Sequence, residues 1–212
     1  MYDNKTNKKL EFQDFSGVET TLYELSKKYA KSKQDRPLIS MAKYEDGKTR
    51  ANDNVVEWTS WCAVDVDSAQ MIDVESELKL DHEFYYVCHS TASSTFEHPK
   101  FRLIIPLTRA VKSSEISHFW YALNKDIGNL VDKQTKDKSR MFYVPAQYEG
   151  ANNFIFTKTG DVLNVDDVMG RHKFVEMPST SYMDKLPADF KAAILKNRKS
   201  KMGISDVRWT SY

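Results

Sequence analysis

Apolar positions along the chain follow two alternating patterns, one typical of helices and one typical of strands. Val18, Leu22 and Leu25 recur at helical spacing and predict an amphipathic helix over residues 18–33. The same kind of spacing predicts further helices at 68–80, opening on Ser68, and at 113–128. Runs rich in Val, Ile, Tyr and Phe predict strands at 36–46, 55–67, 82–91, 100–108 and 140–148, and a hairpin pair at 153–163.

The order of these elements indicates an α+β fold: strand, helix, strand, strand, helix, strand. It fits an RRM-like or split βαβ type, in which an antiparallel or mixed sheet is covered by helices on one face. The pattern changes after about residue 175, where a linker is followed by a basic helix at 189–201. We therefore expect one folded domain over 1–175, and a linker with a basic helix over 176–212.

Composition narrows the class of protein. With 212 residues, 41% of them hydrophobic, the chain can bury a sizeable core. A net charge of +1 excludes a histone-like polycation, so nucleic acid would have to be bound through a local basic patch. Cys62 and Cys88 lie in apolar runs and are expected to be buried thiols, and with five scattered histidines they show no zinc-site spacing. No run is long enough to span a membrane, and we expect a cytoplasmic protein.

Two acidic residues end an apolar strand in the stretch WCAVDVD at 61–67. Residues i and i+2 of a strand point to the same face, about 6.5–7 Å apart, so Asp65 and Asp67 are expected to project together. Paired carboxylates suit a hard cation such as Mg²⁺ or Mn²⁺, and such ions support phosphoryl transfer. The simpler interpretation is that the strand ends here and both acids are solvated or cap the next helix.

Hydroxyl groups and cations gather further along the chain, between residues 85 and 109. Ser90 and Thr91 open a Ser/Thr-rich loop, and Lys100 and Arg102 follow on one face of the next strand. Hydroxyl and exposed N–H groups beside two cations would suit a triphosphate. The alternative is an ordinary hairpin with exposed charges.

The stretch LVDKQTKDKSRMFYVP at 130–145 adds one acid and one cation. Asp132 is a candidate third metal ligand, and Arg140 is a candidate phosphate or template contact. Asp137 competes with Asp132, but lysines flank it on both sides, and we expect it to be solvated. The basic helix at 189–201 is explained equally well by a nucleic-acid contact and by a solvated face.

Taken in order, DVD at 65–67, HSTASSTFEHPKFRLIIPL at 89–107 and VDKQTKDKSRMFYVP at 131–145 resemble the archaeo-eukaryotic primase superfamily. They are most similar to the primase–polymerase domains of phages and plasmids. The resemblance covers about residues 38–160, and the three blocks are specific as an ordered set. It implies a catalytic domain with an RRM-like core, in which Asp65, Asp67 and Asp132 are the catalytic metal ligands for two Mg²⁺ or Mn²⁺ ions.

The second motif of that family is a small residue, any residue, and a histidine that contacts the phosphates of the nucleotide. Here the aligned strand position carries Arg102, while His89 lies on the preceding strand and is the other candidate. His98 lies in the loop and is expected to be exposed. The resemblance thus implies that Lys100, Arg102 and Arg140 neutralise phosphate charge, and the zinc knuckle of some members has no counterpart.

The function implied by the resemblance is that of a DNA-dependent nucleotidyltransferase, a primase or DNA polymerase in phage or plasmid replication. Its partners would be a single-stranded DNA template, NTP or dNTP, and a replicative helicase, which in a longer protein would follow the basic helix. The alternatives are a non-catalytic DNA-binding module of replication initiation and a metal-dependent nuclease. Asp65→Ala is expected to spare the fold by relieving repulsion, and Arg102→Ala to raise the KM for nucleotide.

Overall fold

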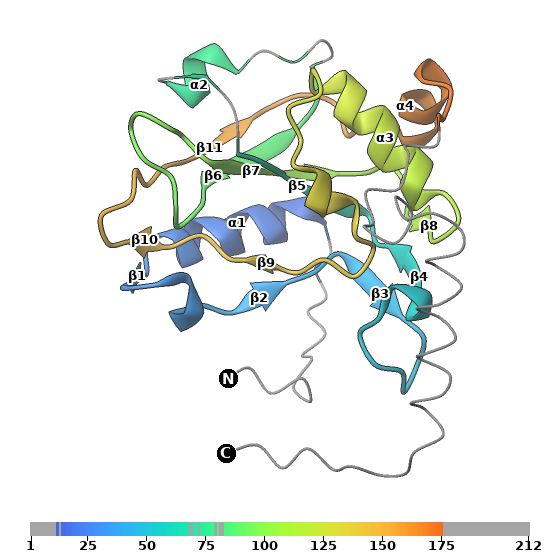
Figure 1. Ribbon diagram of the computed structural model, residues 1–212, viewed down its shortest axis with the longest axis horizontal. Helices are drawn as coiled ribbons and strands as arrows, with labels where there is room; N and C mark the ends of the chain where they lie inside the picture. Colours follow the sequence, from blue (N-terminus) through green and yellow to red (C-terminus); the bar gives the residue numbers. More distant parts are fainter. Residues whose placement is uncertain are drawn as a thin grey trace, which may run out of the picture. The chain divides into compact units, whose positions relative to one another are not determined.

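A four-stranded antiparallel sheet lies at the centre of the computed structural model, in the order β11-β6-β7-β5 (Figure 1). The structure describes residues 12, 14–67, 70, 71, 73–78, 80 and 83–175. Residues 1–174 and 175–212 form two compact units, and the linker and basic helix predicted over 176–212 lie outside the described residues. The central strands are β5 (Trp61–Val66), β6 (Tyr86–Ser90), β7 (Phe101–Pro106) and β11 (Ile155–Lys158).

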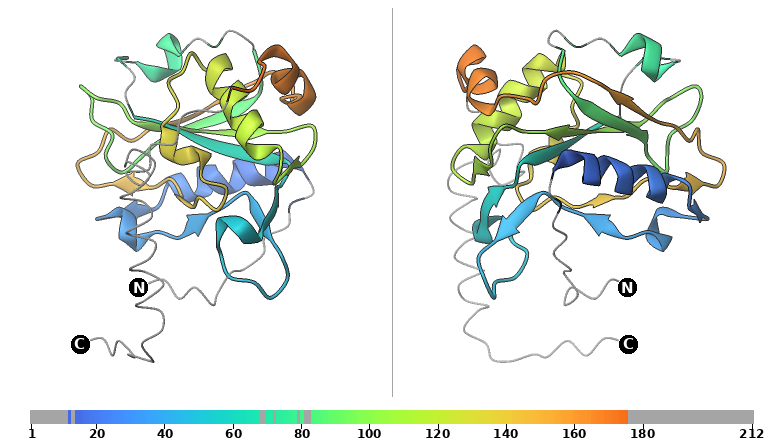
Figure 2. Two further views of the ribbon diagram at one scale, coloured as in Figure 1. Left: turned by 45° about the vertical axis from the view of Figure 1, so that its right-hand side comes forward. Right: turned by 180° about the vertical axis from the view of Figure 1, so that it is seen from behind.

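The central sheet is largely buried because both of its faces are covered. Every residue of β7 is buried, and Val64 and Val66 of β5 are fully buried. Figures 1 and 2 show α1 (Phe15–Ser26) on one side of the sheet, with α3 (Ile116–Asp126) and α4 (Val165–Arg171) on the other. The predicted α+β class and antiparallel sheet are confirmed, whereas the prediction of helices on one face alone is wrong.

Helix α1 begins and ends earlier than predicted. The side chain of Asp14 accepts a hydrogen bond from the Gly17 amide and caps the helix, which ends at Ser26. The residues predicted as its last turns form β1 (Tyr29–Ala30) and the 3-10 turn η1 (Lys33–Asp35) instead. Strand β1 pairs in parallel with β10 (Gln147–Tyr148), and this long-range pairing outweighs the local helical pattern.

Three smaller sheets flank the central one. The predicted strands at 36–46, 55–67 and 140–148 are each divided, and Pro145 separates the last pair because proline cannot donate a ladder hydrogen bond. The pieces join into a three-stranded sheet of order β3-β4-β8 and the pairs β1-β10 and β2-β9. Their bounds are β2 (Leu38–Ile39), β3 (Ala42–Tyr44), β4 (Val55–Trp58), β8 (Val111–Lys112) and β9 (Phe142–Tyr143).

The hairpin predicted at 153–163 is wrong in its second half. Strand β11 pairs with β6, and Asp161 and Leu163 beyond it make only isolated parallel bridges. Helix α4, which the periodicity did not predict, follows these residues. The side chain of Asn164 caps it by accepting hydrogen bonds from the amides of Asp166 and Asp167. The remaining short elements are η2 (Asn52–Asn54), α2 (Val74–Glu77) and η3 (Lys133–Lys136). Helix α2 lies within the helix predicted at 68–80, and the described residues on either side of it are not helical.

The core between the sheet and α3 is rich in large side chains. Trp58, Phe119 and Trp120 are almost completely buried, and the rings of Trp58 and Phe119 pack edge to face. Cys62 and Cys88 are buried free thiols, as predicted. None of the helices in the described part of the chain has the length and apolar character needed to cross a membrane.

Candidate active site

A row of polar side chains crosses the otherwise apolar central sheet. Asp65 on β5 pairs with Arg102 on β7, and Arg102 in turn lies opposite His89 on β6. Residues paired across neighbouring strands point to the same face, so these three side chains stand side by side. All three are buried, and a buried polar group costs free energy unless it has a partner.

Asp65 and Arg102 satisfy one another in a bidentate ion pair. The Nε and Nη2 groups of Arg102 donate to the two carboxylate oxygens of Asp65 at 2.6 and 3.1 Å. Nη1 donates to the carbonyl oxygen of Tyr143 at 2.5 Å, and the guanidinium lies 4.6 Å from the centroid of the Phe142 ring. Arg102 therefore positions Asp65. The expectation that Asp65→Ala spares the fold is revised, because this substitution would leave the buried Arg102 cation without its counter-charge.

The other two predicted acids join Asp65 from different segments. Asp67 directly follows β5 and has an exposed side chain. Asp132 is brought in by an antiparallel bridge between Val66 and Val131, and its backbone N–H donates to the Asp65 carbonyl at 2.7 Å. The sheet edge thus gathers three carboxylates that lie up to 67 positions apart in the sequence.

The carboxylates of this group influence one another. The pKa of Asp67 is raised, first by desolvation among the surrounding walls and then by the negative charges of Asp65 and Asp132. Lys100 and Arg102 act in the opposite direction. Mutual repulsion of this kind is relieved when a cation binds between the acids.

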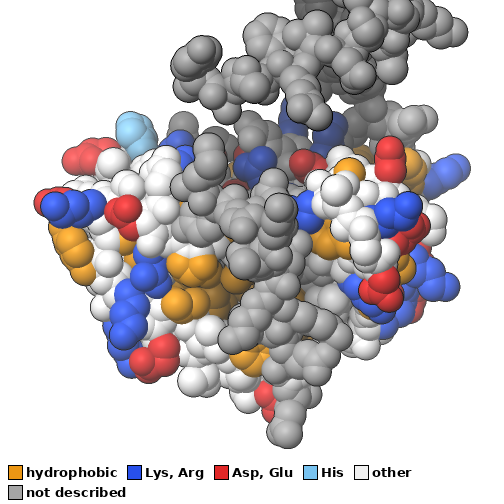
Figure 3. Space-filling view, turned by 90° about the horizontal axis from the view of Figure 1, so that it is seen from below, with side chains coloured by type: hydrophobic (Ala, Val, Ile, Leu, Met, Phe, Trp, Pro, Cys, Tyr) orange, Lys and Arg blue, Asp and Glu red, His pale blue; other side chains and the backbone are white. Residues whose placement is uncertain are grey.

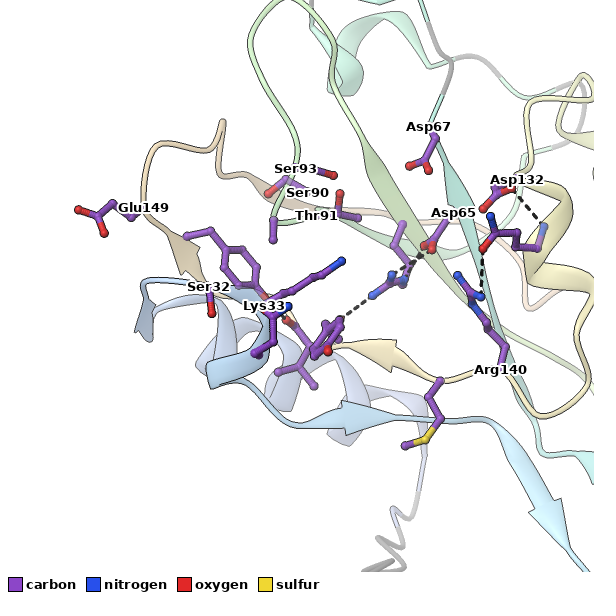
Figure 4. Close-up of a pocket in the computed structure, with 18 of the residues that line it drawn as sticks. Ser32, Lys33, Asp65, Asp67, Ser90, Thr91, Ser93, Asp132, Arg140 and Glu149 are labelled. Atoms are coloured by element: carbon purple, nitrogen blue, oxygen red, sulfur yellow. Dashed lines mark hydrogen bonds and ion pairs between the residues drawn. The ribbon is translucent and has the colours of Figure 1, made fainter. Parts of the chain in front are cut away.

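These acids open into a pocket of about 520 Å³ (Figure 4). Five segments contribute polar side chains to its walls. They are Asp65, Asp67 and Arg102 in or next to β5 and β7; Asp132, Gln134 and Arg140 before β9; Ser90 at the end of β6 with Thr91 and Ser93 after it; Lys31, Ser32, Lys33 and Gln34 around η1; and Glu149 after β10. Apolar and aromatic groups, among them Tyr143 and Tyr148, complete the lining.

Seven of the nine predicted site residues line this pocket; His89 and Lys100 do not. His89 is 1% exposed, and its Nδ1 lies 2.8 Å from the Ser90 carbonyl oxygen. Burial, with the nearby Arg102 charge, lowers the pKa of His89 to about 3, so the ring is neutral. Its Nε2 has no hydrogen-bond partner among the described atoms. This placement gives no support to the prediction that His89 contacts phosphate.

The predicted phosphate-binding residues differ in how freely they can meet a ligand. The Ser90 hydroxyl donates to the Phe154 carbonyl at 3.3 Å and accepts from the Phe154 amide at 3.0 Å. The Ser90 hydroxyl thus holds the start of the loop against the backbone of Phe154. Of the two predicted hydroxyl donors, Thr91 is therefore better placed to contact a ligand. The Nη1 group of Arg140 donates to Gln134 Oε1 at 3.3 Å, while its buried Nε finds no partner in the described part of the chain.

Sequence reasoning missed the wall formed by residues 31–34. It placed residues 31–33 in the helix predicted over 18–33, where nothing connected them with the acids. Their position depends on the β1–β10 pairing, which joins segments more than a hundred residues apart. The two exposed lysines Lys31 and Lys33 were the only feature of this segment that could have pointed to an anion-binding wall. Charge alone, however, is typical of any solvated surface.

The donor set at the acidic end fits a hard divalent cation. Asp65, Asp67 and Asp132 offer carboxylate oxygens, which Mg²⁺ and Mn²⁺ prefer. Arg102 occupies both oxygens of Asp65, but each carboxylate oxygen has two lone pairs and can accept a second partner. As the side chains of the described residues stand, no three His, Cys, Asp or Glu groups are arranged around a metal position. Binding would therefore require the acids to turn toward a common point.

Comparison with known families identifies the class of this chain. Residues 18–181 match the model of the family described as the VapE N-terminal domain. The chain belongs to this family. The matched range contains the central sheet and every candidate site residue.

Among solved structures, this VapE N-terminal domain is similar to one titled cyanophage S-2L primase-polymerase (PrimPol), AEP domain (PP-N190). The identity is 11% and the TM-score is 0.45, over 64% of this chain and 69% of the other. No curated protein matches the chain.

Proposed function

We propose that this VapE N-terminal domain is a DNA-dependent nucleotidyltransferase that synthesises primers on single-stranded DNA from NTPs or dNTPs. The observation that carries the proposal is the meeting of Asp65, Asp67 and Asp132 with phosphate-binding side chains in one pocket. Carboxylates for metal ions beside cations and hydroxyl groups for phosphate are what nucleotidyl transfer requires. The ordered resemblance of three sequence blocks to primase–polymerases supports the same conclusion.

Each side chain of the pocket has a role in this proposal. Asp65, Asp67 and Asp132 would hold Mg²⁺ or Mn²⁺, which when bound activates the attacking hydroxyl and neutralises charge on the leaving pyrophosphate. Arg102 orients the Asp65 carboxylate through two hydrogen bonds. Arg140, which lines the pocket, would neutralise charge on a phosphate group through its guanidinium.

The template strand would be held by its backbone and by stacking on exposed aromatic side chains. On the face in Figure 3, the visible basic and acidic side chains are intermixed around a hydrophobic area. This agrees with the net charge of +1 and favours short, local phosphate contacts over one extended basic surface.

A second candidate function is a non-catalytic replication module that binds nucleotide or DNA through the same pocket. The ion pair between Asp65 and Arg102 favours it, since one of the three acids is already neutralised by the protein itself. A module of this kind would bind its ligands without consuming them.

One assay separates these functions and the nuclease alternative. End-labelled single-stranded DNA and labelled nucleotides are incubated with the protein and Mg²⁺ or Mn²⁺. Our proposal predicts labelled nucleotide in new products, a nuclease would shorten the labelled DNA, and a binding module would do neither while retaining DNA. Asp67→Asn should abolish incorporation, and Asp46→Asn, which alters an exposed acid outside the pocket, should not. Wild-type incorporation by Asp67→Asn would contradict the proposal.

A further inference from the structure

Lys31 and Lys33 line the candidate pocket on the wall formed by the residues around η1. Both side chains are exposed, and in Figure 4 Lys33 extends from η1 into the pocket. Neither lysine belongs to an ion pair within the described ranges. The Lys33 ammonium lies 5.8 Å from the centroid of the Tyr143 ring, which also faces the pocket. Two cations that form no ion pair with a described acid suit an anionic ligand.

The lysine wall is anchored to the hydroxyl-bearing loop on another side of the pocket. The anchor is a small apolar cluster, here called the satellite cluster, made of Ala30, Ala146 and Tyr148 with Ala92 and Ala151 packed against it. Ala30 belongs to β1, Tyr148 to β10 and Ala92 to the loop after β6. Because one cluster joins all three segments, the lysines and the loop hydroxyl groups are held at a fixed spacing.

The turn that presents Lys33 is itself closed by hydrogen bonds. The backbone N–H of Ser32 donates to the Asp35 carboxylate at 2.9 Å, and the Asp35 amide donates to the Ser32 carbonyl at 3.2 Å. The acid at this end of the pocket, Glu149, accepts a hydrogen bond from the Tyr29 hydroxyl. The local acids thus have partners of their own, and the two lysines remain for a ligand.

Charge is divided along the pocket. In Figure 4 Asp65, Asp67 and Asp132 stand at one end of the pocket, and Lys33 and Glu149 lie away from them, beyond the loop hydroxyl groups. In nucleotidyl transfer the α-phosphate must lie beside the metal-binding acids, while the β- and γ-phosphates carry most of the negative charge and need cations. We propose that Lys31 and Lys33 bind the β- and γ-phosphates of the incoming nucleoside triphosphate. This inference rests on the proposed function and specifies which wall receives the triphosphate.

A phosphate of the DNA backbone is the other anion that could meet these lysines. The pocket favours a nucleotide, because its volume of about 520 Å³ suits a single small molecule and the lysines share it with the acids. DNA binding by the same variants is therefore measured as a competing outcome.

The test is direct binding without template, so that no chemistry occurs. Titration calorimetry with Mg²⁺ compares ATP and dATP with their diphosphates and monophosphates, for the wild type and for Lys31→Ala/Lys33→Ala. We expect the double variant to bind triphosphate about tenfold to hundredfold more weakly, with monophosphate affinity unchanged. Lys33→Arg should retain tight triphosphate binding. The control Lys43→Ala/Lys48→Ala removes two exposed lysines outside the pocket and should match the wild type.

The possible outcomes distinguish this inference from the function on which it rests. If the wild type binds no triphosphate, the proposed nucleotidyltransferase function is contradicted and the inference falls with it. If the wild type binds triphosphate and the lysine variant binds it equally well, only the inference is overturned. It is also overturned if the variant loses affinity for single-stranded DNA alone, or loses monophosphate and triphosphate affinity to the same degree.

Discussion

Replacing Arg102 by alanine should destabilise the fold and not merely weaken nucleotide binding. The Asp65 and Arg102 side chains are 11% and 7% exposed, so their ion pair lies out of water. Removing one partner of a buried pair leaves an unpaired charge and costs about 3–5 kcal/mol. The lost hydrogen bond to the Tyr143 carbonyl acts in the same direction. Against a typical domain stability of about 5–15 kcal/mol, this loss is large.

Urea unfolding monitored by tryptophan fluorescence measures the effect of Arg102→Ala. The control is Lys43→Ala, which breaks an exposed pair with Glu57 and should cost less than about 1 kcal/mol. Adding Asp65→Asn to Arg102→Ala should recover part of the stability, since the stranded charge is then removed. A cost below about 1 kcal/mol for Arg102→Ala, with only a raised KM for nucleotide, would refute this reasoning and return Arg102 to the phosphate-binding role predicted from the sequence.

Three further predictions concern His89, the metal-binding acids and the satellite cluster. His89 has a pKa of about 3 in the folded protein, so below about pH 6.5 the unfolded chain binds a proton that the folded protein does not. The free energy of unfolding should therefore fall as the pH drops below about 6.5. Between pH 7.5 and 5 the wild type should lose roughly 2 kcal/mol more of it than His89→Gln does. An equal pH response of the two would contradict this. Mn²⁺ should raise the Tm of the wild type but not of Asp67→Asn/Asp132→Asn, as thermal unfolding with and without chelator would show. Tyr148→Ala should weaken triphosphate binding by loosening the satellite cluster, without changing affinity for monophosphate.

Much of the acidic end of the site could be predicted because its geometry is local. The two-residue period of a strand relates Asp65 to Asp67. Asp132 was only a candidate from its sequence, and the bridge between Val66 and Val131 brings it to them. Arg102 was also predicted at the site, since it stands on a neighbouring strong strand. The ion pair of Arg102 with Asp65 was not predicted, because the position of Arg102 opposite Asp65 depends on the register between β5 and β7.

The remainder depends on contacts between segments far apart in the sequence. Lys31 and Lys33 reach the pocket through the pairing of β1 with β10, which no local pattern indicates. His89 lies near the end of an apolar strand, next to a Ser/Thr-rich loop, and the sheet and its covering elements bury its side chain. The split of residues 140–148 at Pro145 was visible in the sequence, but the two partners of the resulting short strands were not.

Templated nucleotide incorporation tests the central claim most directly. Wild-type protein is given an unprimed single-stranded template containing only dT or only dC, all four nucleotides as NTPs or dNTPs, and Mg²⁺ or Mn²⁺. Our account predicts products made of A on the first template and of G on the second, both absent from Asp67→Asn and unaffected in Asp46→Asn. Bound template and nucleotide without product under every metal condition would contradict catalysis and leave the pocket as a binding site.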